Sequence, residues 1–134
     1  MKNLCLLVLF VFSIVLLASC SDSESTLIGN PDGVFNGKIT IYDSVGVIQQ
    51  VGEINLIQTN STDLNGNWKF SDSYRGKLVG TISGDKVELN LNPEFIDNNT
   101  ILIGTFDGKT ISGDWMQIGI MGVFYEGTFV AKSY

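Results

Sequence analysis

Apolar and polar residues alternate along most of the chain after residue 33. Within this alternation a five-residue unit recurs: apolar, any, glycine, any, apolar, as in residues 111–115, Ile-Ser-Gly-Asp-Trp. Successive side chains of a β-strand point to opposite faces, so each unit places the glycine and both apolar residues on one face. Further copies of the unit have their glycines at Gly37, Gly52, Gly66, Gly80, Gly104 and Gly127. The copy at Gly52 begins with a polar residue, Gln50. The pattern predicts similar strands, each with an inward glycine at a point where the wall bends and no side chain fits.

The alternating stretches predict eight strands with short connections. Their expected bounds are residues 34–42, 49–58, 64–70, 76–83, 86–92, 100–106, 109–117 and 122–132. Gly84-Asp85 and Asp107-Gly108 each lie between two alternating runs, a pattern typical of tight β-hairpins. The one longer connection begins at Asn92-Pro93, and a short helical turn is expected near residues 93–96. Short hairpins in series predict an antiparallel meander.

The predicted strands have one apolar face and one polar face, with Val79, Ile101, Ile103 and Phe124 as apolar exceptions on the polar face. Such alternation is typical of an antiparallel sheet that covers a core on one side. Without a long helix to cover that core, eight strands must close into a barrel or fold as two packed sheets. The glycines favour the up-and-down barrel, because a small closed wall needs sharp bends. A β-sandwich is the alternative. A membrane barrel is disfavoured, because its strands need about 9–11 residues and several of the predicted strands are shorter.

Eight meander strands with Gly-x-Trp units resemble the calycin barrels, which include the lipocalins, the avidin-like proteins and bacterial relatives. The resemblance covers residues 34–134 and concerns architecture more than signature. Lipocalins carry the Gly-x-Trp on the first strand, whereas here the first strand has Gly37-Lys38-Ile39, and the units that end at Trp68 and Trp115 fall on the third and seventh strands. The resemblance implies a barrel and a binding function, and it identifies no ligand contact.

The first nineteen residues differ in kind from the rest of the chain. Lys2 precedes a run from Leu4 to Ala18 that is apolar except for Ser13. This run is too short to span a bilayer comfortably and is typical of the core of a signal peptide. The run ends in Leu17-Ala18-Ser19-Cys20, which resembles the lipobox of bacterial lipoproteins, in which the Cys becomes the acylated N-terminus after cleavage. An uncleaved anchor helix and an ordinary secretory signal are the alternatives.

These features predict three segments: a lipoprotein signal peptide at residues 1–19, a flexible acidic tether at 20–33 and the barrel at 34–134. We expect two or three acyl chains, such as palmitate, at Cys20, because a single chain gives only marginal membrane binding. The acidic residues 21–25 also resemble the surface-export signals of lipoproteins of the Bacteroidetes; a plain solvated linker explains them equally well. The expected location is the bacterial cell envelope, at the outer membrane, either periplasmic or surface-exposed.

Charge and composition exclude several function classes. Removal of Lys2 with the signal peptide would leave seven Lys and Arg against 14 Asp and Glu, a net charge of −7. Such a surface repels nucleic acid. The chain has no His, and Cys5 would leave with the signal peptide while Cys20 is acylated, so Cys/His metal sites and disulfides are not expected. We expect no cofactor and a monomer.

The predicted strands offer no catalytic constellation. Their titratable residues Glu53, Glu88, Asp114 and Glu126 all fall on the polar face, whereas catalysis needs groups that converge in a cleft. We therefore expect a protein that is not an enzyme. Asp43-Ser44-Val45 resembles an O-glycosylation acceptor of the Bacteroidetes, although so short a motif also arises by chance.

The aromatic residues of the apolar face are the candidate ligand-binding residues. We expect Trp68, Phe106, Trp115 and Tyr125 to line any ligand site, since eight-stranded barrels are either just filled or hold one small ligand. The first hypothesis is a non-enzymatic envelope lipoprotein whose lipocalin-like barrel binds a small apolar ligand or an envelope component. The alternative is a protein-binding or inhibitor module that has a filled barrel and acts through surface loops, for example at residues 95–96 or 118–123. A hydrolase is a third hypothesis and would need a buried pair of carboxylates.

Overall fold

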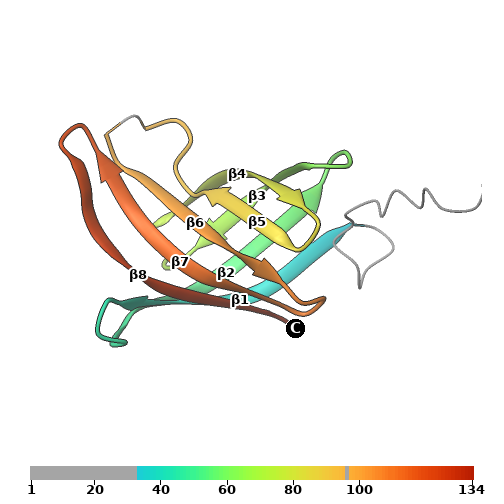
Figure 1. The fold of residues 1–134 in the computed structure, drawn as a ribbon, viewed down its shortest axis with the longest axis horizontal. Helices are drawn as coiled ribbons and strands as arrows, with labels where there is room; N and C mark the ends of the chain where they lie inside the picture. Colours follow the sequence, from blue (N-terminus) through green and yellow to red (C-terminus); the bar gives the residue numbers. More distant parts are fainter. Residues whose placement is uncertain (1–32, 96) are drawn as a thin grey trace, which may run out of the picture.

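The structure, a computed structural model, describes residues 33–95 and 97–134 and is a closed eight-stranded antiparallel β-barrel (Figure 1). The strands are β1 (Val34–Asp43), β2 (Ile48–Gln58), β3 (Asp63–Lys69), β4 (Arg75–Ser83), β5 (Lys86–Asn90), β6 (Asn99–Phe106), β7 (Thr110–Gly119) and β8 (Gly122–Ser133). Each strand pairs with its neighbours in sequence, and β8 pairs with β1 to close the barrel. Cys20, the predicted signal peptide and most of the predicted tether lie outside the described residues.

The predicted all-β class and up-and-down barrel are confirmed, and the alternative β-sandwich is wrong. The helical turn expected near residues 93–96 is wrong for the described part of that segment, because residues 93–95 form a turn in which the N–H of Phe95 donates to the carbonyl oxygen of Asn92 at 3.1 Å. Asn90 Oδ1 also accepts from the N–H of Asn92 at 3.0 Å. Side-chain hydrogen bonds of this kind compete with helical ones. Between residues 33 and 95 and from 97 onward, no helix is long and apolar enough to cross a bilayer.

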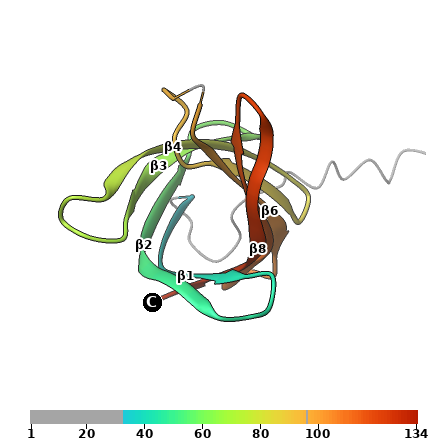
Figure 2. The ribbon, with the colours of Figure 1, turned by 90° about the vertical axis from the view of Figure 1, so that its left-hand side faces the viewer.

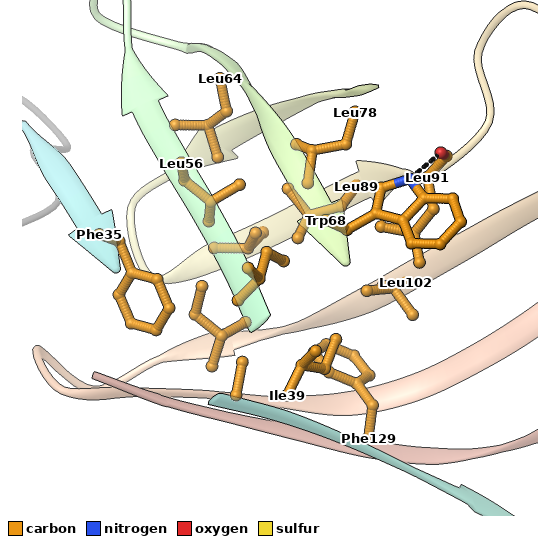
Figure 3. Packing of buried hydrophobic residues seen from close by; sticks show 14 of the residues in the cluster. Phe35, Ile39, Leu56, Leu64, Trp68, Leu78, Leu89, Leu91, Leu102 and Phe129 are labelled. Carbon is orange, nitrogen blue, oxygen red and sulfur yellow. Dashed lines mark hydrogen bonds between the residues drawn. The ribbon is translucent and has the colours of Figure 1, made fainter. Parts of the chain in front are cut away.

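The apolar face predicted from the alternation fills the barrel interior (Figure 3). Its buried residues are Phe35, Ile39, Ile41, Ile54, Leu56, Leu64, Trp68, Leu78, Ile82, Val87, Leu89, Leu91, Leu102, Ile111, Phe129 and Ala131. Burial of these side chains away from water is the main favourable term for the fold. Three of the apolar exceptions noted on the polar face, Val79, Ile103 and Phe124, are exposed.

The glycines of the repeated unit lie where a neighbouring strand approaches the buried face most closely. A Cβ added to Gly66 would overlap the carbonyl oxygen of Asn55, and one added to Gly113 would overlap that of Ile103. Neither glycine has a positive φ, so the requirement is for space and not for an unusual backbone conformation. The expectation that no side chain fits at these inward positions is confirmed.

The turns divide into two groups, one at each end of the barrel. We call the end with the β2–β3, β4–β5 and β6–β7 turns the closed end, where the rings of Phe35 and Phe106 meet edge-on with centroids 6.0 Å apart. We call the other end, with the β1–β2, β3–β4, β5–β6 and β7–β8 connections, the open end. It lies on the left in Figure 1 and faces the viewer in Figure 2. The up-and-down order therefore brings four connections, far apart in sequence, around one mouth.

Candidate functional site

A pocket of about 410 Å³ lies at the open end of the barrel. Its volume falls in the range of about 300–1,000 Å³ that is usual for small-molecule sites. Buried Ile41 and Leu91 are among the residues that line it. The pocket therefore sits on top of the filled core. Five aromatic side chains line it: Trp68, Phe70, Tyr74, Trp115 and Tyr125.

Trp68, at the end of β3, anchors one wall of the pocket. Its indole N–H donates to the carbonyl oxygen of Leu91, which follows β5 (Figure 3), and lies 3.3 Å from that of Lys77. Gly76 opposes Trp68 on β4, and its lack of a side chain leaves room for the indole ring. The ring of Tyr74 meets that of Trp68 edge-on at a centroid distance of 4.8 Å. These contacts hold the ring in one position.

Phe70 and Tyr74 extend this wall beyond the end of β3. The Phe70 ring lies 5.4 Å from Trp68 and stacks on Tyr74 at 5.8 Å. The β3–β4 turn is closed by Ser71, whose Oγ accepts from the N–H of Tyr74 at 3.0 Å. Aromatic pairs in such arrangements contribute about 0.5–1.5 kcal/mol beyond burial of their area. One hairpin thus supplies three of the five rings.

Trp115 anchors the opposite wall, because β7 is four strands from β3 in either direction around the eight-stranded barrel. Its indole N–H reaches across β8 and donates to the carbonyl oxygen of Tyr42 on β1 at 2.6 Å. The crossing passes over Gly127, where an added Cβ would lie 2.7 Å from the indole nitrogen. The glycine of the repeated unit on β8 is therefore what lets Trp115 tie three strands together.

Polar side chains form the rim above the rings. Asp43 holds the β1–β2 turn, since its Oδ1 accepts from the N–H groups of Val45 at 3.0 Å and Val47 at 2.8 Å, and its Oδ2 accepts from Gln49 Nε2 at 3.0 Å. Glu126 lies next to Gly127, the last residue of β8 to pair with β1. Glu126 is exposed and borders the pocket at the point where the wall divides.

The structure brings three of the four predicted ligand-lining residues to this pocket and separates the fourth from them. Trp68, Trp115 and Tyr125 line it, although Tyr125 is at the mouth and 66% exposed. Phe106 does not line the pocket. It is the last residue of β6, which ends at the closed end of the barrel, and its ring packs there against Phe35. Alternation identifies the face of a side chain, but the direction of each strand decides which end of the barrel it reaches.

Sequence reasoning missed Phe70, Tyr74, Asp43 and Glu126 as residues of this site. Strand direction could have grouped them. In a meander every second connection lies at the same end, so the residues that flank the β1–β2, β3–β4 and β7–β8 turns must meet there. Glu126 was assigned to the outer face; it is exposed as expected and also borders the pocket.

The described residues hold no buried polar or charged side chain, and no three of their acidic or thiol groups are placed to share a metal ion. The pKa of Asp72 is lowered by the hydrogen bond and charge of Lys69, whose Nζ lies 2.7 Å away. The pKa of Asp107 is lowered by hydrogen bonds from the backbone N–H groups of Lys109 and Thr110. Neither carboxyl group lines the pocket.

A second hollow, of about 560 Å³, lies on the outer wall of the barrel. Asn36, Asn55, Asn67 and Lys77 border it from β1 to β4, and the C-terminal Tyr134 borders it from one side. It is more open to solvent than the pocket at the open end. Binding sites for small molecules bury most of their ligand, which makes the pocket at the open end the stronger candidate.

No family model, no curated protein and no solved structure matches the sequence or its fold.

Proposed function

We propose that this protein is a non-enzymatic binding protein of the cell envelope, which holds one small, partly apolar ligand in the pocket at the open end of its barrel. The observation that supports the proposal is the five-ring lining of that pocket above a filled core. A core this full leaves no room deeper in the barrel, so the ligand is small and stays near the mouth. The hydrolase hypothesis would need a buried pair of carboxylates, and the described residues contain none.

The proposal is tested with N-phenyl-1-naphthylamine, an uncharged apolar fluorophore. We expect saturable binding at one site. Thr100→Phe should abolish it, since Thr100 is an inward residue of β6 that lines the pocket. Thr105→Phe is the matched control, because Thr105 lies on the outer face of the same strand and is exposed. Binding that survives Thr100→Phe, or no binding by the wild-type protein, would overturn the proposal.

We also propose that the protein is a lipoprotein anchored through Cys20. The support is the sequence alone: an apolar run of signal-peptide length followed directly by Leu17-Ala18-Ser19-Cys20. The Cys20→Ser protein should move from the membrane fraction to the soluble fraction of the cell. If it stays in the membrane fraction as the wild type does, the apolar run is itself the anchor and the lipobox hypothesis is wrong.

A protein-binding module is the second candidate, and a specific observation favours it. Large apolar side chains project from the loops around the mouth: Val45 is 81% exposed, Ile120 79%, Met121 88% and Phe95 63%. Apolar side chains gathered on one face of a protein can mark an interaction surface. The fluorophore experiment separates the two candidates. A folded wild-type protein that binds no fluorophore would favour recognition through the loop tips.

A further inference from the structure

The pocket at the open end combines aromatic rings with carboxylates and has no cationic side chain in its lining. Asp43 and Glu126 line it, whereas none of the seven Lys and Arg residues in the described part of the chain does. From this combination we propose that its ligand is an organic cation, a substituted or quaternary ammonium group with a small apolar body. The inference rests on the proposed function and assigns the ligand class for the same site.

The rings are suited to a cation because their faces attract positive charge and the indole N–H groups are already engaged in hydrogen bonds. The faces of Trp, Tyr and Phe rings carry negative charge density and attract ammonium groups, most strongly when several rings surround the charge. The indole N–H groups of Trp68 and Trp115 donate to the backbone carbonyls of Leu91 and Tyr42. They are therefore not free to donate to an anionic ligand.

The two carboxylates add attraction from one side of the mouth. Asp43 and Glu126 stand on β1 and β8, at the point where these neighbouring strands stop pairing. The hydrogen bonds that Asp43 accepts all come from the β1–β2 segment, and none comes from a Lys or Arg. Among the described residues, no hydrogen bond or ion pair engages the carboxylate of Glu126. A bound cation would meet two charges that no protein cation neutralises.

The same inventory disfavours an anionic ligand such as a fatty acid. A carboxylate in the pocket would face Asp43 and Glu126, and three of the side-chain amides in the lining already donate within the protein. Of the rim amides, Gln49 Nε2 donates to Asp43, and Gln117 Nε2 donates to the side chain of Asn98. Lys69, next to Trp68 in sequence, points to the outer face and pairs with an exposed carboxylate at 2.7 Å. Discrimination between cation and anion is therefore part of the site.

The inference is tested with three ligands of the same size and shape: choline, its uncharged isostere 3,3-dimethyl-1-butanol, and 3,3-dimethylbutanoate. Each competes against N-phenyl-1-naphthylamine, with tryptophan fluorescence as a second readout. We expect choline to bind about tenfold more tightly than the alcohol, and the anion most weakly. Added salt should weaken choline binding and leave that of the alcohol nearly unchanged.

Glu126→Gln should weaken choline binding severalfold and leave alcohol binding unchanged. Glu88→Gln, an exposed change on the outer face of β5, is the matched control and should alter neither. If the alcohol or the anion binds as tightly as choline, or if the fluorophore binds and none of the three displaces it, the cation inference is wrong and the proposed function stands. If the fluorophore does not bind either, both are wrong.

Discussion

The closed end and the open end of the barrel are built from the same hairpins and differ in where they place apolar side chains. At the closed end the turns are polar, as at Asn60, Ser61 and Thr62, and the rings of Phe35 and Phe106 pack inside. At the open end the interior holds a pocket, and large apolar side chains stand outside on the loops. The closed end is therefore packed to stabilise the fold, and the open end is the one that the proposed function assigns to binding.

Strand β1 shows the change within one chain segment. Its inward positions run from Phe35 and Ile39 through Ile41, all at most 5% exposed, to Asp43 at the mouth. Apolar burial ends where polar side chains begin to point into the pocket. A polar group placed deeper would need a hydrogen-bond partner inside the barrel, so the polar residues belong at the end that water reaches.

The two tryptophans of the pocket differ in burial and should therefore differ in their contribution to the free energy of unfolding. Trp68 is 3% exposed and belongs to the core, whereas Trp115 is half-buried and packs against the core from its edge. Both satisfy their N–H through a backbone carbonyl on another strand. They should therefore differ in how much the fold depends on each, although both line the pocket.

The largest expected effect is that of Trp68→Ala. Removal of a buried ring of this size costs about 3–5 kcal/mol, and here it would also leave the carbonyl of Leu91 without its donor. Urea unfolding measures the loss. Trp115→Ala should cost clearly less while reducing ligand binding more than any outer-face change. Equal costs at the two positions would show that the half-buried ring of Trp115 supports the fold as much as the buried ring of Trp68, and the expected difference between them would be wrong.

The second prediction concerns the glycine rows that let the wall close. Gly113→Val should destabilise the protein by about 1–3 kcal/mol, even though Val favours strands, because its side chain would press on the backbone of Ile103 and Gly104. Ser112→Val is the control on the exposed face of the same strand and should change little. A neutral or stabilising Gly113→Val would mean that this half of the wall has spare room, contrary to a closed and filled end.

The fold was predictable from the sequence because one simple rule applied to every strand. Alternation sets which side chains point inward, and tight turns such as Gly84, with φ of 63°, set where each strand ends. Eight strands with no other layer to cover them could close or fold as a sandwich, and the inward glycines favoured closure. The strands and turns could therefore be predicted from residues close together in sequence, without knowledge of any long-range contact.

The pocket was only partly predictable, because it depends on strand direction and on side-chain reach. Alternation correctly predicts that Phe106 faces inward, but it does not predict that the ring lies at the closed end beside Phe35. The bond from Trp115 to Tyr42 joins residues 73 positions apart across an intervening strand, and no local pattern encodes it. Glu126 reaches the pocket only because pairing between β1 and β8 stops beside it. Such features arise from closure itself.

The third prediction is a pH effect at Asp107, in the β6–β7 turn of the closed end. Backbone hydrogen bonds lower the pKa of Asp107 in the folded protein, so its contribution to stability is present above its ordinary value of 3.8 and is lost as the pH falls through the lowered value. Asp107→Asn should lower the melting temperature at about pH 7, and the difference should vanish near pH 2. Asp85→Asn, in the β4–β5 turn, is the control, since no described residue donates a hydrogen bond to the Asp85 side chain. A difference that persists at low pH would assign the effect to something other than the charge.

The smallest expected effect is that of the loop tips on stability. Ile120 and Met121 occupy the β7–β8 turn before Gly122, whose φ of 108° suits glycine, and both side chains are almost fully exposed. Ile120→Ser and Met121→Ser together remove apolar surface that is buried in neither the core nor the pocket. The free energy of unfolding should therefore change by less than about 0.5 kcal/mol. Fluorophore binding should also be unchanged, since neither residue lines the pocket. A large loss of stability would show that the tips pack on the barrel. In that case the open end would need its apolar loops for folding, and the division between a stabilising end and a recognition end would be wrong.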